Sequence, residues 1–491
     1  MHEKERSDTI LSVTEVAVLA LVFAVVHALA YIAGLRYDAA SLGLFMQFLD
    51  PELLRQRLIE SLFYLHIQPP LFNLFLGVGL KLGDAGGPVF FQGVYLVLGF
   101  LTYAAIYALQ RRLYVSQRIA FATSTVFMAS PAFLLTEHWL FYTFPCAAVL
   151  TLSCVCLCAF ARKGNRGPLW AFFGCLLLLA GLRSVFHLVW VAAIGGSVMA
   201  VFPRYRKRVA LAAGVAFFLA ALPYAKNAVL FGEFTQNSWS GKHLWIKTVG
   251  NMDPRERRRL YNEGLLTDVS RPGLNRFETT GFYPQKYVDV TGFEDIPALR
   301  QFHKSTGHIN YNHLAQIAIS RDYGRDARYV LLRYPKTFLL TTLQAGLVYF
   351  QSNASWARES ANYARLRPWV RLYDGLVYGK LPVNAFASLP NIAKLVRAQY
   401  AVLMLVLPLA FLAGAYAAIR GRFAGFSLGK SDRILFGYMA FNILFVGGLA
   451  VLFEIAETAR IRFMTDPLSV VLLGFVLQRA IAHFKTKWHE G

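Results

Sequence analysis

The residues of this chain that could support chemistry are carboxylates beside apolar segments. Asp38 follows the first apolar segment by three residues, and Glu137 lies in the short turn "TEHW" between two further apolar segments. A carboxylate close to a bilayer is costly unless it has a partner or a function. Such a group could act as a general base and take a proton from an incoming hydroxyl. The alternatives are a solvated helix end for Asp38 and a solvated turn residue for Glu137.

Cationic residues flank apolar segments on the same predicted side. Arg183 ends one apolar segment, and Arg460 and Arg462 precede the last one. Guanidinium groups at this depth suit a phosphate at the level of the lipid headgroups. Lys226 and Lys242 are further candidates for the same anion. The alternative is that these side chains extend to ordinary phospholipid headgroups.

The stretch "YLHIQPPLFNLFLG" places His66 and Gln68 ahead of two prolines and a short apolar run. That run, Leu71–Leu82, has 12 residues, whereas a transmembrane helix needs about 20. Proline disfavours helix in the residue before it, so the tandem proline separates this run from the preceding segment. We expect a short juxtamembrane helix, with His66 beside Asp38. Upstream, "DPELL" predicts a helix that Asp50 caps.

The composition indicates that membrane helices position these residues. The chain has 491 residues, 56% of them hydrophobic, and a mean hydropathy of +0.43, which excludes a soluble protein. The net charge of +22 could suggest nucleic acid, but the basic residues lie mostly at the ends of apolar segments, which favours membrane lipids. The five cysteines lie inside apolar stretches without metal-ligand spacing, so we expect core residues.

The apolar segments predict an all-α polytopic membrane protein with about ten transmembrane helices, and 10–12 as the range. Spanning segments are expected at Val16–Leu35, Pro88–Gln110, Ile119–Leu135, Trp139–Ala161, Pro168–Leu182, Ser184–Pro203, Val209–Ala225, Ala398–Ile419, Ile434–Phe453 and Pro467–Gln478. Basic clusters occur at every second turn. Because short basic loops stay in the cytoplasm, both termini are expected inside and the candidate residues outside.

This topology divides the chain into three parts. Residues 1–245 form a transmembrane catalytic module whose first external loop is 36–87 and contains juxtamembrane helices. Residues 246–396 form a small external segment with an interfacial helix over 337–351, and residues 397–491 form the C-terminal transmembrane helices.

With these residues in place, the chain resembles the GT-C superfamily of integral membrane glycosyltransferases, and most of all its branch of lipid A aminoarabinose transferases and protein O-mannosyltransferases. In that family a catalytic acidic residue after the first helix precedes a tandem proline, and here Asp38 stands 31 residues before Pro69. A second acidic residue in the next external turn matches Glu137. The ending "ETARIRFMTDPL" is also similar, whereas 250–396 is not covered. The family's paired acidic motif is reduced to the single carboxylate of "YDAAS", so a divalent cation is not supported and no cofactor is expected.

The resemblance implies an inverting transferase of the bacterial inner membrane, with its active site facing the periplasm. Asp38 would deprotonate the acceptor, while Glu137 and His66 would line the acceptor side or orient Asp38. Arg183, Arg460 and the other cations above would hold the phosphate of a polyprenyl-phosphate-linked sugar donor. The acceptor would be a glycan, lipid or protein. The alternatives are a polysaccharide polymerase or O-antigen ligase and, from another class, a lipid-linked sugar flippase or transporter.

Overall fold

The fold is described from a computed structural model of the chain. The structure describes residues 11–490, except 275–276, 358–359, 383–384, 386–387, 389–395 and 397. In these residues the strands form one antiparallel hairpin, β1 (Arg422–Phe423) with β2 (Phe426–Ser427), and nearly all other elements are helices. The predicted all-α class is therefore confirmed.

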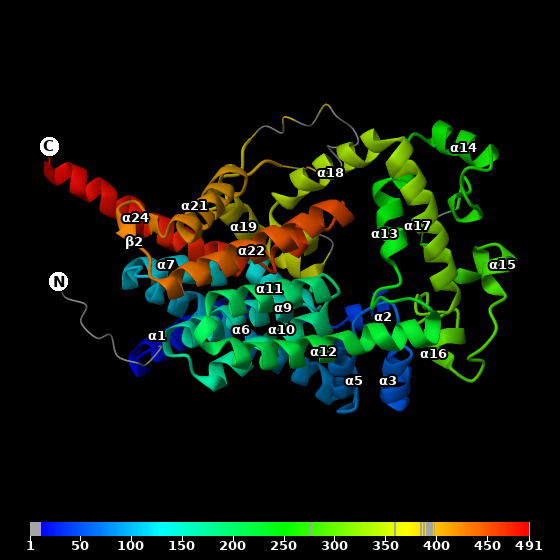
Figure 1. Cartoon of the computed structure of the whole chain (residues 1–491), viewed down its shortest axis with the longest axis horizontal. Helices are drawn as coiled ribbons and strands as arrows, with labels where there is room; N and C mark the ends of the chain where they lie inside the picture. Colours follow the sequence, from blue (N-terminus) through cyan, green and yellow to red (C-terminus); the bar gives the residue numbers. More distant parts are fainter. Residues whose placement is uncertain are drawn as a thin grey trace.

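Helices form most of the molecule (Figure 1). Within the described ranges, six helices are long and apolar enough to cross a membrane: α1 (Val13–Ile32), α6 (Gly83–Arg112), α9 (Thr143–Lys163), α12 (Arg206–Phe231), α21 (Leu407–Arg420, with the preceding π-helical turn Val402–Val406) and α22 (Lys430–Phe453). A seventh span is possible as a pair bent by 56°, α7 (Gln117–Met128) and α8 (Pro131–Glu137). The chain is thus a polytopic membrane protein.

The predicted count of about ten also includes helices that do not meet these criteria of length and hydropathy. Two of them, α10 (Arg166–Leu182) and α11 (Leu188–Val201), are apolar but shorter, and the last is α24 (Asp466–Glu490). Length and composition support six or seven of the ten predicted spans, and the other three or four stay a prediction.

The loop over residues 36–87, predicted to be external, contains four short helices, α2 (Ser41–Leu44), α3 (Pro51–Gln56), α4 (Leu58–Phe63) and α5 (Pro70–Leu80). Asp50 caps α3 as predicted, and its carboxylate accepts a hydrogen bond of 2.9 Å from the Glu52 amide. The helix α5 begins at the second proline and has 11 residues, so it is about 16 Å long and too short to cross the hydrocarbon layer. The predicted short helix is confirmed.

A separate helical unit lies at one end of the molecule, on the right in Figure 1. It contains α13 (Ser240–Lys247), α14 (Pro254–Asn262), α15 (Gln285–Val288), α16 (Pro297–Arg300), α17 (Ala315–Arg333) and the 3₁₀ turns Val249–Asn251, Asp268–Ser270 and Thr280–Phe282. Its own hydrophobic core extends from Trp245 to Val330. At the crossing of α13 and α17, a Cβ on Gly241 would lie 2.0 Å from the Ser320 carbonyl oxygen, so only glycine fits there.

The chain then returns to the membrane helices through α18 (Pro335–Tyr349), the 3₁₀ turn Asn353–Ala357 and α19 (Ala361–Leu376). α18 occupies the place of the predicted interfacial helix, and its position in the membrane stays a prediction. The side-chain amide of Asn362 hydrogen-bonds both backbone groups of Arg36. This contact anchors the chain where it leaves α1. Between α22 and α24 lies one short helix, α23 (Thr458–Arg462).

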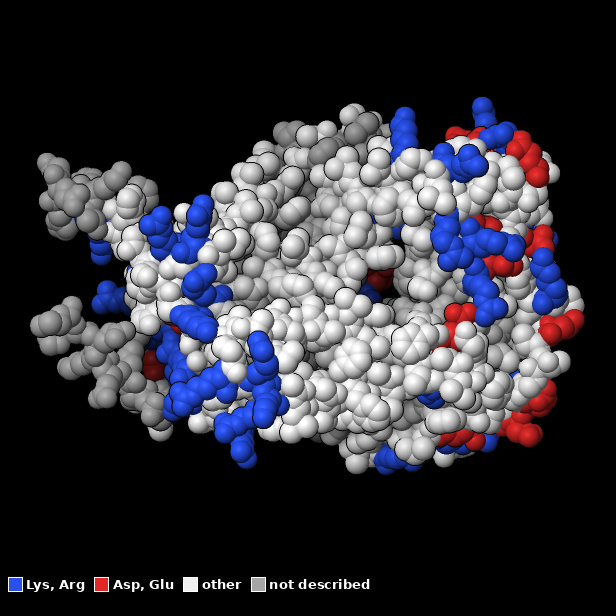
Figure 2. Space-filling view, in the orientation of Figure 1, with Lys and Arg blue, Asp and Glu red and all other residues white. Residues whose placement is uncertain are grey.

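The basic turns gather at the opposite end, where α1 begins and α24 ends (Figures 1 and 2). Arg162 in the last turn of α9 donates to the carbonyl of Arg112, the last residue of α6, at 2.9 Å and lies 3.4 Å from Asp432 of α22. The Tyr114 ring packs on Phe426 of the hairpin. The charge pattern therefore predicted which turns share a face, while the side of the membrane stays a prediction.

The cysteines lie in the helical core as predicted. All five are free thiols, with Cys146, Cys154 and Cys158 buried and Cys156 and Cys175 half-buried.

Candidate active site

Asp38 has a fixed backbone and a carboxylate that lacks a cationic partner. It forms an isolated parallel bridge with Trp139, in which the Asp38 amide donates to the His138 carbonyl at 2.8 Å and the Leu140 amide donates to the Asp38 carbonyl at 2.9 Å. One carboxylate oxygen accepts from the Ala40 amide at 2.9 Å. The side chain is half-buried and forms no ion pair within the described ranges. The backbone thus holds Asp38 in place and leaves most of its acceptor capacity unused.

Glu137 comes from the turn that pairs with Asp38, so the structure brings these two segments together as predicted. Its side chain is 0% exposed, which excludes the alternative of a solvated turn residue. One oxygen, Oε2, lies 2.5 Å from Nε2 of His27 in α1, and the other, Oε1, has no hydrogen-bond partner among the described residues. A Cβ on Gly99 of α6 would lie 1.7 Å from Oε1, so α6 covers this carboxylate closely. Glu137 therefore joins the turn to α1 and α6 and does not face an open site.

Two arginines far apart in the sequence meet at the Tyr142 ring. The Arg183 guanidinium lies 4.3 Å from the ring centroid and that of Arg460 lies 5.9 Å from it. Among the residues that the structure describes, three buried polar atoms here have no hydrogen-bond partner: Nη1 of Arg183, Nε of Arg460 and the Tyr142 hydroxyl. Buried donors of this kind are rarely left unpaired unless a ligand, an ion or water satisfies them. We refer to these three residues as the arginine pocket.

The helices α9, α10 and α23 bring the arginine pocket together. Arg183 directly follows α10, Tyr142 precedes α9, and Arg460 belongs to α23. The Arg460 guanidinium is held in place by a hydrogen bond of 3.0 Å to Thr143 Oγ1 and by an ion pair with Glu457. Figure 2 shows a hollow between α13 and the end of α22, with acidic and basic atoms at its bottom.

The charges around the arginine pocket perturb one another. Burial and the nearby Arg460 lower the pKa of Arg183 to about 9, so Arg183 is still a cation at neutral pH. Burial, with Glu457 beside it, raises the pKa of Glu454 to about 7. The negative charge that faces Arg183 therefore varies near neutral pH. A carboxylate at Glu454 would compete with an anionic ligand, whereas the protonated form would not.

A continuous set of aromatic rings connects Asp38 to the arginine pocket. The Trp139 ring stacks on Phe141 at 4.3 Å with an interplanar angle of 10°. The Arg460 guanidinium lies 4.7 Å from the Phe141 ring and 4.9 Å from Trp356. The five residues after Glu137, His138 to Tyr142, therefore extend from the Asp38 bridge to the arginines. This segment therefore links the general-base candidate Asp38, which pairs with it, to the two arginines, which contact its rings.

Arg462 differs from Arg460 in its environment. Its guanidinium is buried and bonds Asp466 at 3.1 Å, the Asn353 side chain at 2.9 Å and the Tyr349 carbonyl. These partners use all three guanidinium nitrogens. The structure therefore gives Arg462 a role in holding α18 and the 353–357 turn against α23 and α24, and it does not bring Arg462 into the arginine pocket. An apolar cavity of about 360 Å³ between α18, α21 and α22 adjoins it.

The two candidate lysines also lie elsewhere. Lys226 donates to the Leu65 carbonyl at 2.5 Å, which ties α12 to the first external loop. Lys242 is buried in the end unit, where it donates to Gln316 at 3.1 Å and lies 4.6 Å from the Trp239 ring. The structure thus gives both lysines contacts within the fold and does not bring them to the arginine pocket.

His66 has partners in the end unit and makes no described contact with Asp38 or Glu137. Its Nδ1 lies 2.7 Å from Ser238 Oγ and its Nε2 lies 2.9 Å from the Asn312 carbonyl. Burial lowers the pKa of His66 to about 3, so the ring is neutral. A partner 246 positions away in the sequence therefore holds the ring, and the expectation that His66 lies beside Asp38 stays a prediction.

Sequence reasoning missed several residues of the site. His27 lies inside the first predicted span, and an ionisable side chain within a span is itself a signal of function. Glu454 and Glu457 stand next to the arginines that were selected. Tyr142 and Trp356 carried no signal, because aromatic residues are common at membrane interfaces. In the described ranges, no group of three or more His, Cys, Asp and Glu side chains could hold a metal ion.

The fold and the site define an integral membrane protein with a buried cationic pocket beside a positioned carboxylate. No family model and no curated protein matches the chain. The chain is similar to two crystal structures of ArnT from Cupriavidus metallidurans, over 93% of this chain and 77% of that chain. The structure bound to undecaprenyl phosphate is 15% identical with a TM-score of 0.34, and the apo structure is 14% identical with a TM-score of 0.28. ArnT belongs to the branch that the sequence resembles. At these values the similarity carries no argument about function.

Proposed function

We propose that this protein is a glycosyltransferase that transfers a sugar from a polyprenyl-phosphate-linked donor to a cell-envelope acceptor. The reaction takes place on the non-cytoplasmic face of the bacterial inner membrane and inverts the anomeric centre. The acceptor is a hydroxyl group of a glycolipid, a polysaccharide or a protein. The arginine pocket is the observation on which this proposal depends most.

The arginine pocket suits the phosphate of the donor. Two guanidinium groups and a hydroxyl leave three buried polar atoms without partners, and all three can donate hydrogen bonds to phosphate oxygens. Arg183 remains charged near neutral pH, so the pocket is attractive to an anion. Donors already in position would stabilise the charge that grows on the phosphate as the glycosyl bond breaks.

Asp38 supplies the base in this proposal. The acceptor oxygen attacks the anomeric carbon, the bond from that carbon to the phosphate oxygen breaks, and polyprenyl phosphate leaves. The Asp38 carboxylate takes the proton of the acceptor hydroxyl. Its free acceptor capacity and its fixed backbone suit this task, because a general base must be held within hydrogen-bond reach of the proton that it removes.

Glu137 acts as a positioning residue. Its buried contact with His27 anchors the turn that pairs with Asp38 and then continues to Phe141 and Tyr142. The lipid chain of the donor has a place in the apolar cavity beside Arg462, between α18, α21 and α22. Burying an apolar chain there contributes binding energy in proportion to the area removed from water.

The test is the substitution Asp38→Asn, assayed in proteoliposomes with a polyprenyl-phosphate-linked sugar and an acceptor extract. We expect transfer to fall by at least a factor of about 100, because general-base catalysis contributes roughly 10² to 10⁴. Donor binding, measured separately, should change little. The matched control is Asp84→Asn, an exposed carboxylate near the end of the same loop that pairs with Arg55.

Other outcomes would identify other functions. Unchanged transfer by a folded Asp38→Asn protein would refute the assignment of the base and favour a polymerase or ligase with a different centre. Movement of the lipid-linked sugar across the membrane without a covalent product would favour a flippase. If the Arg183→Gln protein lost donor binding while the Asp38→Asn protein still bound the donor, donor binding would be assigned to Arg183 and removal of the acceptor proton to Asp38.

A further inference from the structure

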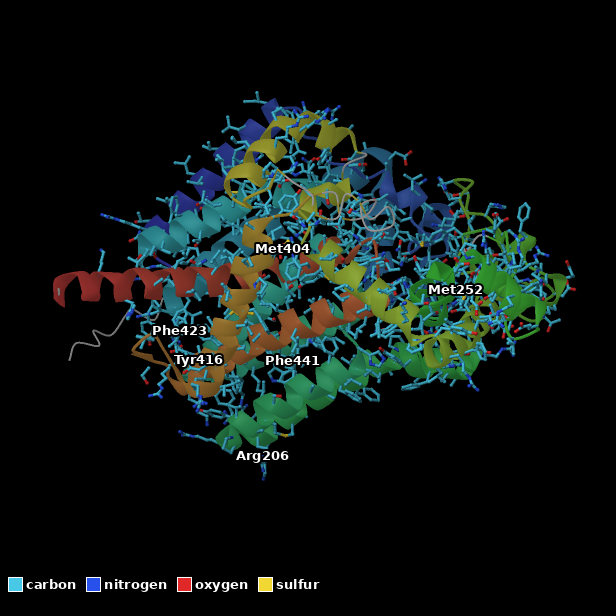
Figure 3. The ribbon with its side chains drawn as sticks, turned by 90° about the horizontal axis from the view of Figure 1, so that it is seen from above. Arg206, Met252, Met404, Tyr416, Phe423 and Phe441 are labelled. Atoms are coloured by element: carbon cyan, nitrogen blue, oxygen red, sulfur yellow. The ribbon has the colours of Figure 1, made fainter. Side chains whose placement is uncertain are left out.

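A second cavity lies at the basic end of the molecule, among α9, α11, α21 and α22. Its volume is about 620 Å³, which is within the range of small-molecule sites. None of the residues of the candidate active site lines it. Figure 3 shows α21 and α22 meeting near Tyr416 and Phe423, with Phe441 further along α22.

The cavity has one cationic end and one apolar end. Lys430 and Arg433, in the first turn of α22, line it where the helix begins. Phe441 lines it 11 residues later, which is about 16 Å further along the helix axis. Most of the other lining side chains are apolar. The cavity therefore extends from the basic end of the molecule into the helix bundle.

Small residues create the space. On α11 the lining side chains include Ala193, Ser197 and Ala200, and on α22 they include Gly437. A Cβ on Gly437 would meet no atom within 4 Å. The helices therefore do not close against each other here, and the space is large enough for part of a lipid chain.

Within the part of the chain that the structure describes, Lys430 and Arg433 have no carboxylate partner. Asp432, the acidic residue between them, is buried and directed to Arg162. Arg433 donates to the Ala418 and Ile419 carbonyls at the end of α21, which are uncharged groups. Lys430 is exposed and, within the described ranges, forms no ion pair.

We propose that this cavity binds one anionic phospholipid, with the headgroup phosphate at Lys430 and Arg433 and an acyl chain extending toward Phe441. Basic pockets between transmembrane helices are suited to anionic headgroups, and the apolar part of the cavity requires a ligand with a hydrocarbon chain. A soluble anion would leave that part empty. This proposal stands independently of the proposed transferase activity.

The experiment measures lipid retention on the full-length protein by native mass spectrometry, with dioleoylphosphatidylglycerol or dioleoylphosphatidylcholine added to the detergent. Wild type should prefer the anionic lipid. Lys430→Gln should weaken retention about fivefold, since one cation near a headgroup contributes about 1 kcal/mol. Gly437→Leu should abolish it by filling the cavity. The matched controls are Lys207→Gln, from another basic turn, and Gly174→Leu on α10, where a Cβ also meets no atom.

Equal retention of the two lipids by wild type would overturn the proposal, as would unchanged retention in both Lys430→Gln and Gly437→Leu. Competition by inorganic phosphate at the same concentration as the lipid would indicate a site for a free anion instead. If Gly437→Leu lost polyprenyl phosphate but kept phosphatidylglycerol, the cavity would belong to the donor. Lys430→Gln changes an exposed side chain, so it decides the outcome even if Gly437→Leu does not fold.

Discussion

The buried pair between His27 and Glu137 yields the most demanding prediction. The side chains are 11% and 0% exposed, and the pair joins α1 to the turn that holds Asp38. The substitution His27→Phe keeps an aromatic ring but removes both nitrogens. Glu137 would then have no hydrogen-bond partner for either oxygen, since Oε1 has none already and His138 Nδ1 lies 3.7 Å from Oε2. Breaking a buried pair in this way costs about 3–5 kcal/mol, because a charge stays buried without compensation.

The double variant His27→Phe with Glu137→Leu separates this cause from simple loss of packing. Replacing both members of a buried pair by apolar groups is often close to neutral. We therefore expect the double variant to recover most of the loss, with a coupling energy of about 3 kcal/mol in the double-mutant cycle. Glu137→Gln, which can still bond His27, should cost about 1 kcal/mol.

The assay is unfolding of the purified protein in mixed micelles with increasing SDS, followed by tryptophan fluorescence and by pulse proteolysis. Transfer activity is measured on the same samples. If the double variant lost as much free energy of unfolding as the two single variants together, the buried charge would not be the cause of the destabilisation. A folded Glu137→Gln protein with transfer reduced as far as in Asp38→Asn would refute the positioning role and make Glu137 a participant in the reaction.

Further predictions concern pH and topology. Because the pKa of Glu454 is raised to about 7, binding of a phosphodiester donor should weaken as pH rises from 6 to 8 and a negative charge forms near the arginines; Glu454→Gln should flatten this profile in a binding titration. His66 has a pKa of about 3 in the folded protein and 6.5 as its ordinary value, so the unfolded state takes up its proton first as pH falls. The free energy of unfolding should therefore decrease as the pH falls below about 6.5, by up to about 1.4 kcal/mol per pH unit. The decrease should be less steep in His66→Gln, and SDS unfolding at each pH measures both. Finally, Asp84→Cys should react with an impermeant thiol reagent from outside and Lys207→Cys should not; the reverse pattern would invert the predicted topology.

Local sequence features predicted much of the fold. Apolar length located the helices, the tandem proline marked the start of α5, and Asp50 was recognised as a helix cap because the residues that form a cap are neighbours in the sequence. The basic turns also share one end, as the spacing of charge along the chain predicted. These features depend on interactions within one helix or between one helix end and the bilayer.

The composition of the candidate site depended on contacts between distant segments. Arg460 and Arg462 look equivalent in the sequence, but residues two apart on a helix do not face the same neighbours, and only Arg460 meets Tyr142 and Arg183. His66 contacts Asn312 rather than Asp38 because the end unit folds back onto the first loop. Which polar atoms remain unpaired follows from these long-range contacts, since a side chain's partners are set by packing of the whole bundle. The sequence could therefore name the chemistry, whereas the packing selected the residues that are free to perform it.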